Sequence, residues 1–205
     1  MIRVRRVSRL RVVRLAEVAG LTLAMLGLGV PGIASAAGPT CLGERATIVA
    51  KPGVERVDGT AAADVIVGLG GRQIISGGDG DDVICGKAGS DVIDGGAGDD
   101  RMSGGGGADY ITGVGGDDLL LGGLGVDTLN FGDEEAGDDT VFGGPGDDDL
   151  HAGVGADRLF GGAGNDFLAE GEVDAPVVDL FAGGFGVDTC FAGAEDVVRG
   201  CEIRT

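Results

Sequence analysis

The chain has 205 residues, of which 45 are glycine and 4% are aromatic, and it contains no tryptophan. Such a composition supplies poorly the large side chains that fill the close-packed core of an ordinary domain. The formal net charge of −19 argues against nucleic acid and anionic membranes as partners and favours cations.

Residues 1–36 differ in charge from the rest. Six arginines lie between Arg3 and Arg14, and they precede an apolar segment at 18–30 and a small-residue run at 34–37. This order predicts a secretory signal peptide over residues 1–36, and therefore a secreted, extracellular protein. The apolar segment is shorter than the roughly 20 residues that a membrane-spanning helix needs, so we expect no membrane span in the mature chain.

The mature chain is strongly acidic. From Ala37 onward it carries nine basic and 33 acidic residues, a net formal charge of −24. Self-repulsion of this size opposes a compact state unless cations neutralise it.

A nine-residue repeat follows residues 37–49, which we interpret as an N-terminal cap. Nine contiguous units run from Ala50 to Asn130, and those that begin at Gly77 and Gly95 show the pattern most clearly: Gly-Gly-x-Gly-x-Asp-x-apolar-x. Position 8 is apolar in every unit. A disordered, low-complexity chain is the alternative that the composition suggests, but it has no reason to keep an apolar side chain at this spacing.

The repeats continue after a break in register. Three extra residues at 131–133 are followed by four more units, so we expect a repeat domain over residues 50–169. Residues 170–205 contain a second insertion at 170–173, two degenerate units and a C-terminal cap.

Four cysteines flank or enter the repeats: Cys41, Cys85, Cys190 and Cys201. In an exported chain they predict disulfides, and three pairings are possible. We favour Cys41 with Cys85 and Cys190 with Cys201, one clamp at each end of the repeat region.

The two parts of the repeat predict different local structures. The glycines of the first six positions favour a sharp turn, and the last three positions favour a short strand whose middle side chain points inward. Two units then form one coil, and successive coils stack as parallel strands about 4.8 Å apart. The sequence predicts an all-β fold, a parallel β-roll with two repeats per coil.

Stacked coils bring the position-6 aspartates into two rows. Asp82 and Asp100 are expected along one edge, and Asp91 and Asp109 along the other. Calcium takes about six to eight oxygen ligands, which carboxylates and turn carbonyls supply together, whereas magnesium requires stricter octahedral geometry. Transition metals prefer imidazole or thiolate, and besides its cysteines the mature chain offers only His151. The pattern therefore favours calcium.

The repeat resembles that of the RTX, or haemolysin-type, calcium-binding proteins, whose consensus is G-G-x-G-x-D-x-(large apolar)-x. The resemblance covers about residues 50–191 and is to a small, secreted kind without a catalytic domain. It implies a right-handed β-helix solenoid with several Ca²⁺ ions between neighbouring turns, held by position-6 aspartates and turn carbonyls.

Carried over to this chain, the resemblance implies two sets of ligands. The carboxylate ligands are Asp82, Asp91, Asp100, Asp109, Asp118, Asp127, Asp139, Asp148, Asp157 and Asp166, with Asp64 and Asp188 as weaker ligands. The carbonyl ligands belong to Gly77, Gly78, Gly80, Gly95, Gly96, Gly98, Gly104, Gly105, Gly107, Gly122, Gly123, Gly125, Gly143, Gly144, Gly146, Gly161, Gly162 and Gly164.

Some units depart from the consensus. Glu55 and Gln73 occupy the aspartate position, Lys87 and Val114 replace a second glycine, and Ala152 replaces a first one. We expect the first coil and the coil that contains Lys87 to bind calcium weakly or not at all.

The predicted function is extracellular calcium binding coupled to folding. We expect that one inward apolar side chain per unit does not offset a backbone entropy of about 1–2 kcal/mol per residue, so the binding free energy of calcium must contribute to folding. A calcium-stiffened adhesion or matrix protein is the alternative. Phe142 and Phe160 occupy the same position two repeats apart and so are expected side by side on one face, where they would serve self-association or an extracellular partner.

No catalytic activity is predicted. The chain contains no H-E-x-x-H or G-x-S-x-G motif. His151 lies at position 9 of its unit, where a surface residue is expected, and paired acids such as Asp81-Asp82 recur as part of the scaffold. An accessory domain of a hydrolase is a less favoured alternative.

Overall fold

The computed structural model describes residues 38–130, 137–169 and 178–204, which belong to one compact unit. The predicted signal peptide at 1–36 and the two insertions, 131–133 and 170–173, lie outside the described residues. Within the described part, no helix is long and apolar enough to cross a membrane.

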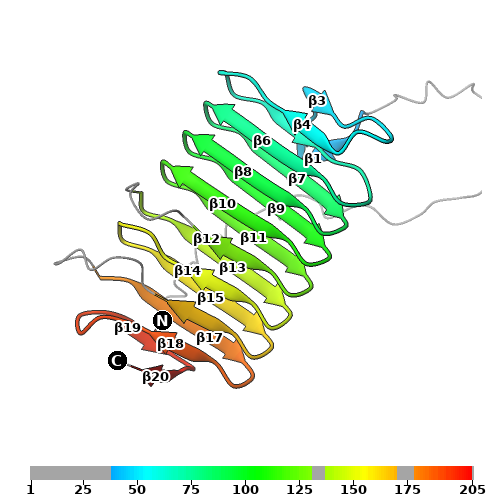
Figure 1. Ribbon diagram of the computed structural model, residues 1–205. Helices are drawn as coiled ribbons and strands as arrows, with labels where there is room; N and C mark the ends of the chain where they lie inside the picture. The colour runs from blue at the N-terminus through cyan, green and yellow to red at the C-terminus, as the bar shows by residue number, and fades with distance from the viewer. Residues whose placement is uncertain (1–37, 131–136, 170–177, 205) are drawn as a thin grey trace, which may run out of the picture. The chain divides into compact units, whose positions relative to one another are not determined.

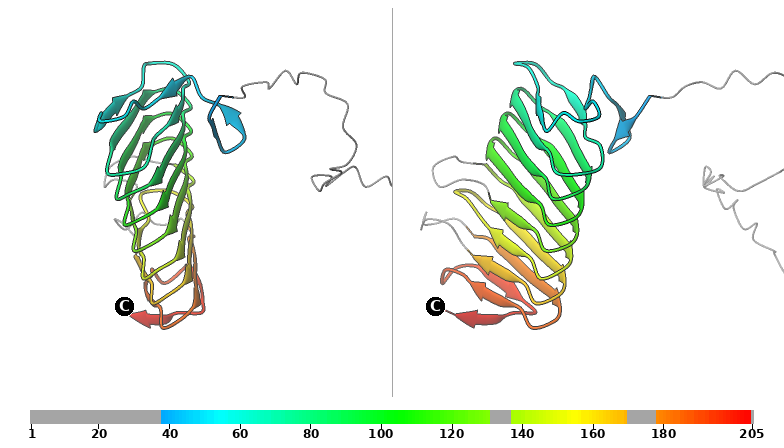
Figure 2. Two further views of the ribbon diagram at one scale, coloured as in Figure 1. Left: turned by 90° about the vertical axis from the view of Figure 1, so that its right-hand side faces the viewer. Right: turned by 45° about the vertical axis from the view of Figure 1, so that its right-hand side comes forward.

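The repeats form a β-solenoid in which the strands alternate between two parallel sheets, each with nine strands in the described residues. Figure 1 shows the coils stacked in chain order, and the two turned views in Figure 2 show the sheets as two facing layers. Neighbouring strands of one sheet are two repeats apart in most of the roll; Ile93, for example, pairs with Ile75 and Ile111. The predicted parallel β-roll is confirmed.

We call the two layers sheet 1 and sheet 2. Sheet 1 contains β3 (Ile48–Val49), β5 (Val65–Val67), β7 (Val83–Ala88), β9 (Arg101–Gly106), β11 (Leu119–Leu124), β13 (Thr140–Pro145), β15 (Arg158–Ala163), β17 (Leu180–Phe185) and β19 (Val197–Arg199). Sheet 2 contains β4 (Arg56–Asp58), β6 (Ile74–Asp79), β8 (Val92–Ala97), β10 (Tyr110–Gly115), β12 (Thr128–Asn130), β14 (Asp149–His151), β16 (Phe167–Ala169), β18 (Thr189–Phe191) and β20 (Glu202–Arg204).

The core is a single file of position-8 side chains between the two sheets. Ile84, Ile93, Met102 and Ile111 are each fully buried, and the file ends near Phe181 and the Cys190 side chain. Each repeat therefore contributes one large apolar side chain to the interior, as its spacing predicts. This leaves the roll with a narrow core for its length.

Many strands are longer than the three positions per repeat that the sequence predicts. β7 continues through the first three positions of the next unit, where Lys87 pairs with Gly105 and Ala88 with Gly106. The prediction was too short because the turn backbones also stack in register. Because the first two of these positions are glycine in most units, the backbones of adjacent coils approach closely enough to extend the parallel ladder.

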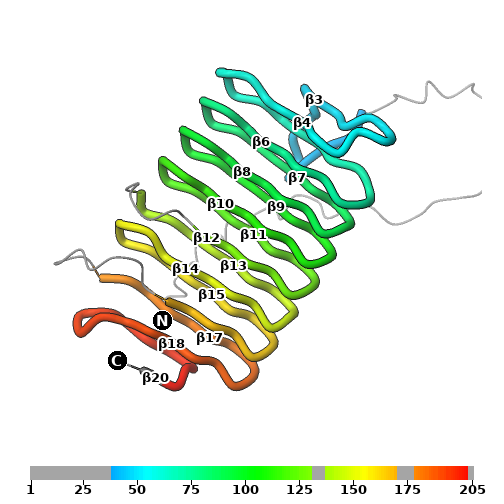
Figure 3. Tube along the Cα trace, viewed as in Figure 1, coloured from blue at the N-terminus to red at the C-terminus, as the bar shows by residue number. Residues whose placement is uncertain are grey.

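The register of the strands records the predicted insertions. Leu120 pairs with Val141. The separation of this pair exceeds two repeats by the length of the insertion at 131–133. Leu159 pairs with Phe181, and here the excess over two repeats equals the length of the insertion at 170–173. The repeats on both sides of each insertion thus remain in one continuous stack, which the tube in Figure 3 follows coil by coil.

The two sheets extend into both predicted caps. At the N-terminal end, Ile48 pairs with Ile66 in sheet 1. At the C-terminal end, Val198 pairs with Phe181, and β20 pairs with β18. Residues that the sequence assigned to the caps therefore form the first and last strands of the roll.

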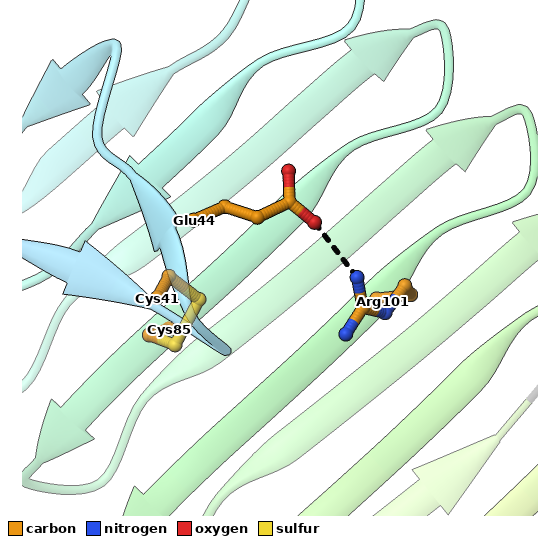
Figure 4. A network of polar contacts seen from close by, with 4 residues as sticks. All are labelled: Cys41, Glu44, Cys85 and Arg101. Atoms are coloured by element: carbon orange, nitrogen blue, oxygen red, sulfur yellow. Dashed lines mark hydrogen bonds and ion pairs between the residues drawn. A yellow bond between two sulfur atoms is a disulfide. The ribbon is translucent and has the colours of Figure 1, made fainter. Parts of the chain in front are cut away.

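Both favoured disulfides are present, Cys41–Cys85 and Cys190–Cys201. The first fastens the antiparallel hairpin β1 (Thr40–Cys41) and β2 (Glu44–Arg45) onto the outer face of sheet 1, where Cys41 packs with Val67 and Val83. Figure 4 shows this disulfide beside the ion pair of Glu44 with Arg101, whose closest atoms are 2.8 Å apart. The hairpin covers the outer face of the first coils.

Val114 occupies a backbone conformation that suits glycine. Its φ is +88°, in register with Gly96, whose φ is +108°. A non-glycine residue in the left-handed region costs about 1–2 kcal/mol, more than the roughly 0.5–1 kcal/mol of entropy that glycine loses on folding.

Val114→Gly is therefore expected to stabilise the calcium-loaded protein by about 1 kcal/mol, measured from its denaturation midpoint at fixed calcium. Val92→Gly in β8 is the matched control. It removes the same side chain from ordinary strand backbone and is expected to destabilise. If the Val114→Gly protein is less stable than its parent, the backbone at Val114 is not strained.

Candidate metal centre

The position-6 aspartates form two rows along the two turn edges of the roll. Edge 1 denotes the turns that lead into the strands of sheet 1, and edge 2 those that lead into sheet 2. The aspartates of both rows are buried, with relative exposures from 0% to 8%. Edge 1 contains Asp64, Asp82, Asp100, Asp118, Asp139, Asp157 and Asp179. Edge 2 contains Gln73, Asp91, Asp109, Asp127, Asp148, Asp166 and Asp188.

One oxygen of each carboxylate fastens adjacent coils together. The backbone N–H of Asp82 donates to Oδ1 of Asp100 at 2.7 Å, and that of Asp100 donates to Oδ1 of Asp118 at 2.8 Å. Edge 2 repeats the contact, since the N–H of Asp91 donates to Oδ1 of Asp109 at 2.8 Å. The two rows are therefore continuous hydrogen-bonded ladders that run along the roll.

The second oxygen is left over. In ten described aspartates, Oδ2 is buried and has no hydrogen-bond partner; these are Asp82, Asp91, Asp100, Asp109, Asp118, Asp127, Asp148, Asp157, Asp166 and Asp188. Burying a carboxylate oxygen without a hydrogen-bond partner destabilises the folded state, because the oxygen loses its hydrogen bonds to water and no protein group replaces them. One such atom would be an accident, but its repetition in turn after turn indicates a missing positively charged partner.

Carbonyl oxygens lie close to these orphaned atoms. A methyl group built on Gly122 would lie 2.6 Å from Oδ2 of Asp127 and also 2.6 Å from the carbonyl oxygen of Gly143 in the next coil. The same side of the turn therefore presents a carboxylate oxygen and a backbone oxygen. Position-4 carbonyls also face the following coil, since a methyl group on Gly98 would lie 2.5 Å from the carbonyl oxygen of Gly80.

Burial shifts the acidity of these carboxyls. It raises the pKa of Asp100 to about 7 and that of Asp118 to about 8, against the lowering effect of the backbone hydrogen bond that each accepts. The same cause raises the pKa of Asp157 to about 7, and neighbouring carboxylates add to the effect in all three. Ionisation of the rows is therefore unfavourable unless cations lie nearby.

Side chains alone do not make a complete metal site. Among the residues that the structure describes, no group of three or more Asp, Glu, His or Cys side chains is placed to hold a metal ion. The carboxylates do not converge on one another, because Oδ1 of each is turned to a neighbouring N–H. An ion bound here would therefore be coordinated mostly by backbone carbonyl oxygens and by few carboxylates. Such an all-oxygen ligand set suits a hard cation.

The model of the RTX calcium-binding nonapeptide repeat matches four stretches of the chain, 58–93, 76–111, 94–129 and 135–168, which together cover more than half of it. The chain belongs to the RTX calcium-binding nonapeptide repeat family. No curated protein matches it. The repeats of this family are calcium-binding, and the orphaned oxygens of the two rows fit such an ion.

The RTX rows are longer than the sequence predicts. The N–H of Asp157 donates to Oδ1 of Asp179 at 2.9 Å, and the N–H of Asp179 donates to Oδ1 of Asp196 at 3.0 Å. Neither Asp179 nor Asp196 was a predicted site residue. The sequence Asp-Val-Val at 196–198 could have identified Asp196, because it has the Asp-x-apolar order of positions 6 to 8. It lies one residue closer to Asp179 than two full repeats would place it. Asp188, predicted as a weak ligand, has the same orphaned Oδ2 as the central aspartates.

The RTX turn that contains Lys87 keeps the regular geometry. Lys87 takes the glycine conformation, with φ of +87°, and its Nζ donates to the carbonyl oxygen of Thr40 at 3.2 Å. Oδ2 of Asp91, in the same turn, is orphaned like the others. The geometry therefore groups this turn with its neighbours, and its predicted weak calcium binding remains a prediction.

Proposed function

We propose that this RTX protein is a secreted calcium-binding protein that winds into its roll when calcium binds. The proposal is carried by one observation: ten buried aspartates each bring an oxygen without a partner to a turn of a calcium-binding repeat. The proposed carboxylate ligands are the position-6 aspartates of both edges from Asp82 onward, and the proposed carbonyl ligands are those of the turn glycines. When bound, the ions supply positive charge to the two rows.

The protein's own residues explain why the ions would drive folding. In the wound state, the rows bring like charges into neighbouring turns, and burial further disfavours the ionised carboxylates. The core offers only one large side chain per repeat against this cost. Binding to the wound state alone converts the binding free energy of each ion into folding free energy, about 2.7 kcal/mol per site at one hundred times its dissociation constant.

Secretion agrees with this chemistry. The two disulfides belong in an oxidising compartment. Extracellular calcium modules commonly have dissociation constants of about 10⁻⁴–10⁻³ M, and such sites would stay empty inside the cell and fill outside it.

Isothermal titration of the purified protein with calcium tests the proposed function directly. We expect several ions per molecule, dissociation constants of about 10⁻⁴–10⁻³ M, and much weaker binding of magnesium, which requires a stricter geometry. A protein that releases no heat, and that takes up no calcium in equilibrium dialysis, would refute calcium binding.

The outer face of sheet 1 favours a second candidate function, as a calcium-stiffened interaction surface. Phe142 and Phe160 stack there with ring centroids 4.7 Å apart, as their spacing predicts, and Phe142 is exposed. From β9 to β19 the outward residues of the described strands include no acid, although the chain is strongly acidic. They are Arg101, Ser103, Leu119, Leu121, Thr140, Phe142, Arg158, Phe160, Leu180, Ala182, Val197 and Arg199.

Two copies of so acidic a chain repel each other least through this face. If it serves self-association, light scattering should show a larger species only with calcium, and Phe142→Lys should abolish that species. Phe191→Lys on sheet 2 is the control and should leave it unchanged. A protein that is monomeric both with and without calcium would refute self-association but not calcium binding.

A further inference from the structure

Three turns at the ends of the rows differ from all those with an orphaned oxygen. They contain Asp64 and Gln73 near the N-terminal end of the roll and Asp196 in the last strand region of sheet 1. In each, the side chain that would face an ion already has protein partners for its oxygens. The contacts close both rows at the N-terminal end and edge 1 at the C-terminal end.

Asp64 is saturated by two threonines. Its Oδ1 accepts a hydrogen bond from Oγ1 of Thr47 at 2.9 Å, and its Oδ2 accepts from the backbone N–H and Oγ1 of Thr60 at 2.9 and 2.8 Å. Despite burial, these hydrogen bonds lower the pKa of Asp64, opposite to the shift of the central aspartates. An ion at this carboxylate would have to displace contacts that are already made.

Gln73 places an amide where its neighbours place a carboxylate. Its Oε1 accepts from the N–H of Leu69 at 2.6 Å, and its Nε2 donates to the carbonyl oxygen of Val54 at 3.3 Å. A methyl group on Gly68 would meet this Oε1, just as one on Gly122 would meet Oδ2 of Asp127. The amide therefore fills the place of the orphaned oxygen and also occupies a carbonyl of the preceding coil.

Asp196 closes edge 1 at the other end. Its Oδ1 accepts from the N–H of Asp179 at 3.0 Å, and its Oδ2 accepts from the N–H of Gly193 at 2.6 Å. Both oxygens are thus used, as they are in Asp64.

The residue at position 2 supplies the closing hydrogen bond in the turns of Asp64 and Gln73. Thr60 and Leu69 are not among the residues with positive φ, and their N–H groups donate to the side chain at position 6 of the same turn. In nine of the ten described turns with an orphaned Oδ2, position 2 has positive φ, as in Gly78 and Gly96; the turn of Asp157, with Gly153 at position 2, is the exception. At Thr60 and Leu69, a backbone without positive φ turns the N–H toward the position that an ion would otherwise neutralise.

We propose that Asp64 and Gln73 close the two calcium rows at the N-terminal end and that Asp196 closes edge 1 at the C-terminal end, so that the turns containing them take no ion. The inference rests on the proposed calcium binding. It identifies the N–H groups of Thr60 and Leu69 as the donors that occupy the place of an ion in the turns of Asp64 and Gln73. The closed coil gives the next coil a metal-free surface on which to stack.

The test counts calcium ions bound at saturation, by native mass spectrometry and by titration calorimetry, in three variants of the protein. Leu69→Gly combined with Gln73→Asp is expected to open the turn and to add one ion per molecule. Gln73→Asp alone is expected to add none, because the N–H of Leu69 would saturate the new carboxylate as that of Thr60 saturates Asp64. Thr60→Gly is expected to open the Asp64 turn and to add one ion.

Two results would overturn the inference: an unchanged count in the Leu69→Gly/Gln73→Asp variant, or an added ion in Gln73→Asp alone. Each variant must first show the parent's circular dichroism spectrum in excess calcium, and hydrogen exchange of residues 59–73 reports whether the turn has changed. A parent protein that binds no calcium would instead refute the proposed function, so the two failures are distinguishable.

Discussion

Removal of calcium by a chelator is expected to unwind the protein, with loss of most of its β-sheet circular dichroism and an increase in its hydrodynamic radius. The reason is the imbalance between a narrow core of one side chain per repeat and two rows of buried carboxylates. Several sites, each contributing about 2.7 kcal/mol at one hundred times its dissociation constant, together match or exceed the roughly 5–15 kcal/mol of an ordinary domain. The fold should therefore depend on the ions more than on apolar burial.

Titration of calcium back into the chelated protein should restore the spectrum cooperatively, since each coil provides the surface for the next. Sodium chloride at equal ionic strength is the control for screening, because diffuse ions weaken the repulsion of exposed charges but cannot occupy the orphaned oxygens. A chain that keeps its full spectrum in excess chelator would show that the roll holds together without metal.

Replacement of two neighbouring ladder aspartates is expected to cripple calcium uptake. Asp100→Asn combined with Asp118→Asn retains the Oδ1 acceptors for the N–H groups of Asp82 and Asp100. It replaces only the orphaned Oδ2 atoms with amides, which carry no charge. We expect fewer bound ions and a tenfold or larger increase in the calcium concentration that half-winds the roll, measured by circular dichroism during a calcium titration.

The same edge offers a matched control in Asp99→Asn combined with Asp117→Asn. These residues precede the ladder pair, and their Oδ1 atoms also accept backbone N–H groups, but the side chains are exposed. The control should bind calcium nearly as its parent does, because water already solvates its carboxylates. Equal losses in the two double variants would mean that net charge, rather than the buried rows, governs binding.

Much of the fold follows from local chemistry and could be predicted. A turn that needs glycine, followed by a strand with one inward side chain, leaves a chain of such units little choice except to stack. The file of Ile84, Ile93 and Met102, the two rows of aspartates and the shifts of register at both insertions all derive from this spacing. The two disulfide pairings could also be predicted, because the four cysteines fall into one pair towards each end of the repeat region.

Other features depend on contacts between coils, which spacing cannot reveal. Asp64 and Asp82 occupy the same position of the repeat. Oδ2 of Asp82 nevertheless has no partner, whereas both carboxylate oxygens of Asp64 accept hydrogen bonds, from Thr47 and Thr60. Thr47 comes from the preceding coil, so its contact exists only after stacking. The extension of the strands into the turns has the same origin.

The repeat by itself therefore determined the architecture, the inward file and the residues able to meet a cation. Only the tertiary structure decided which of those carboxylates remain without a partner, because Asp64 accepts hydrogen bonds both from Thr60 in its own turn and from Thr47 in another coil. The physical reason is that backbone spacing is set locally, whereas the satisfaction of a buried polar atom is decided by every group that folding brings within reach.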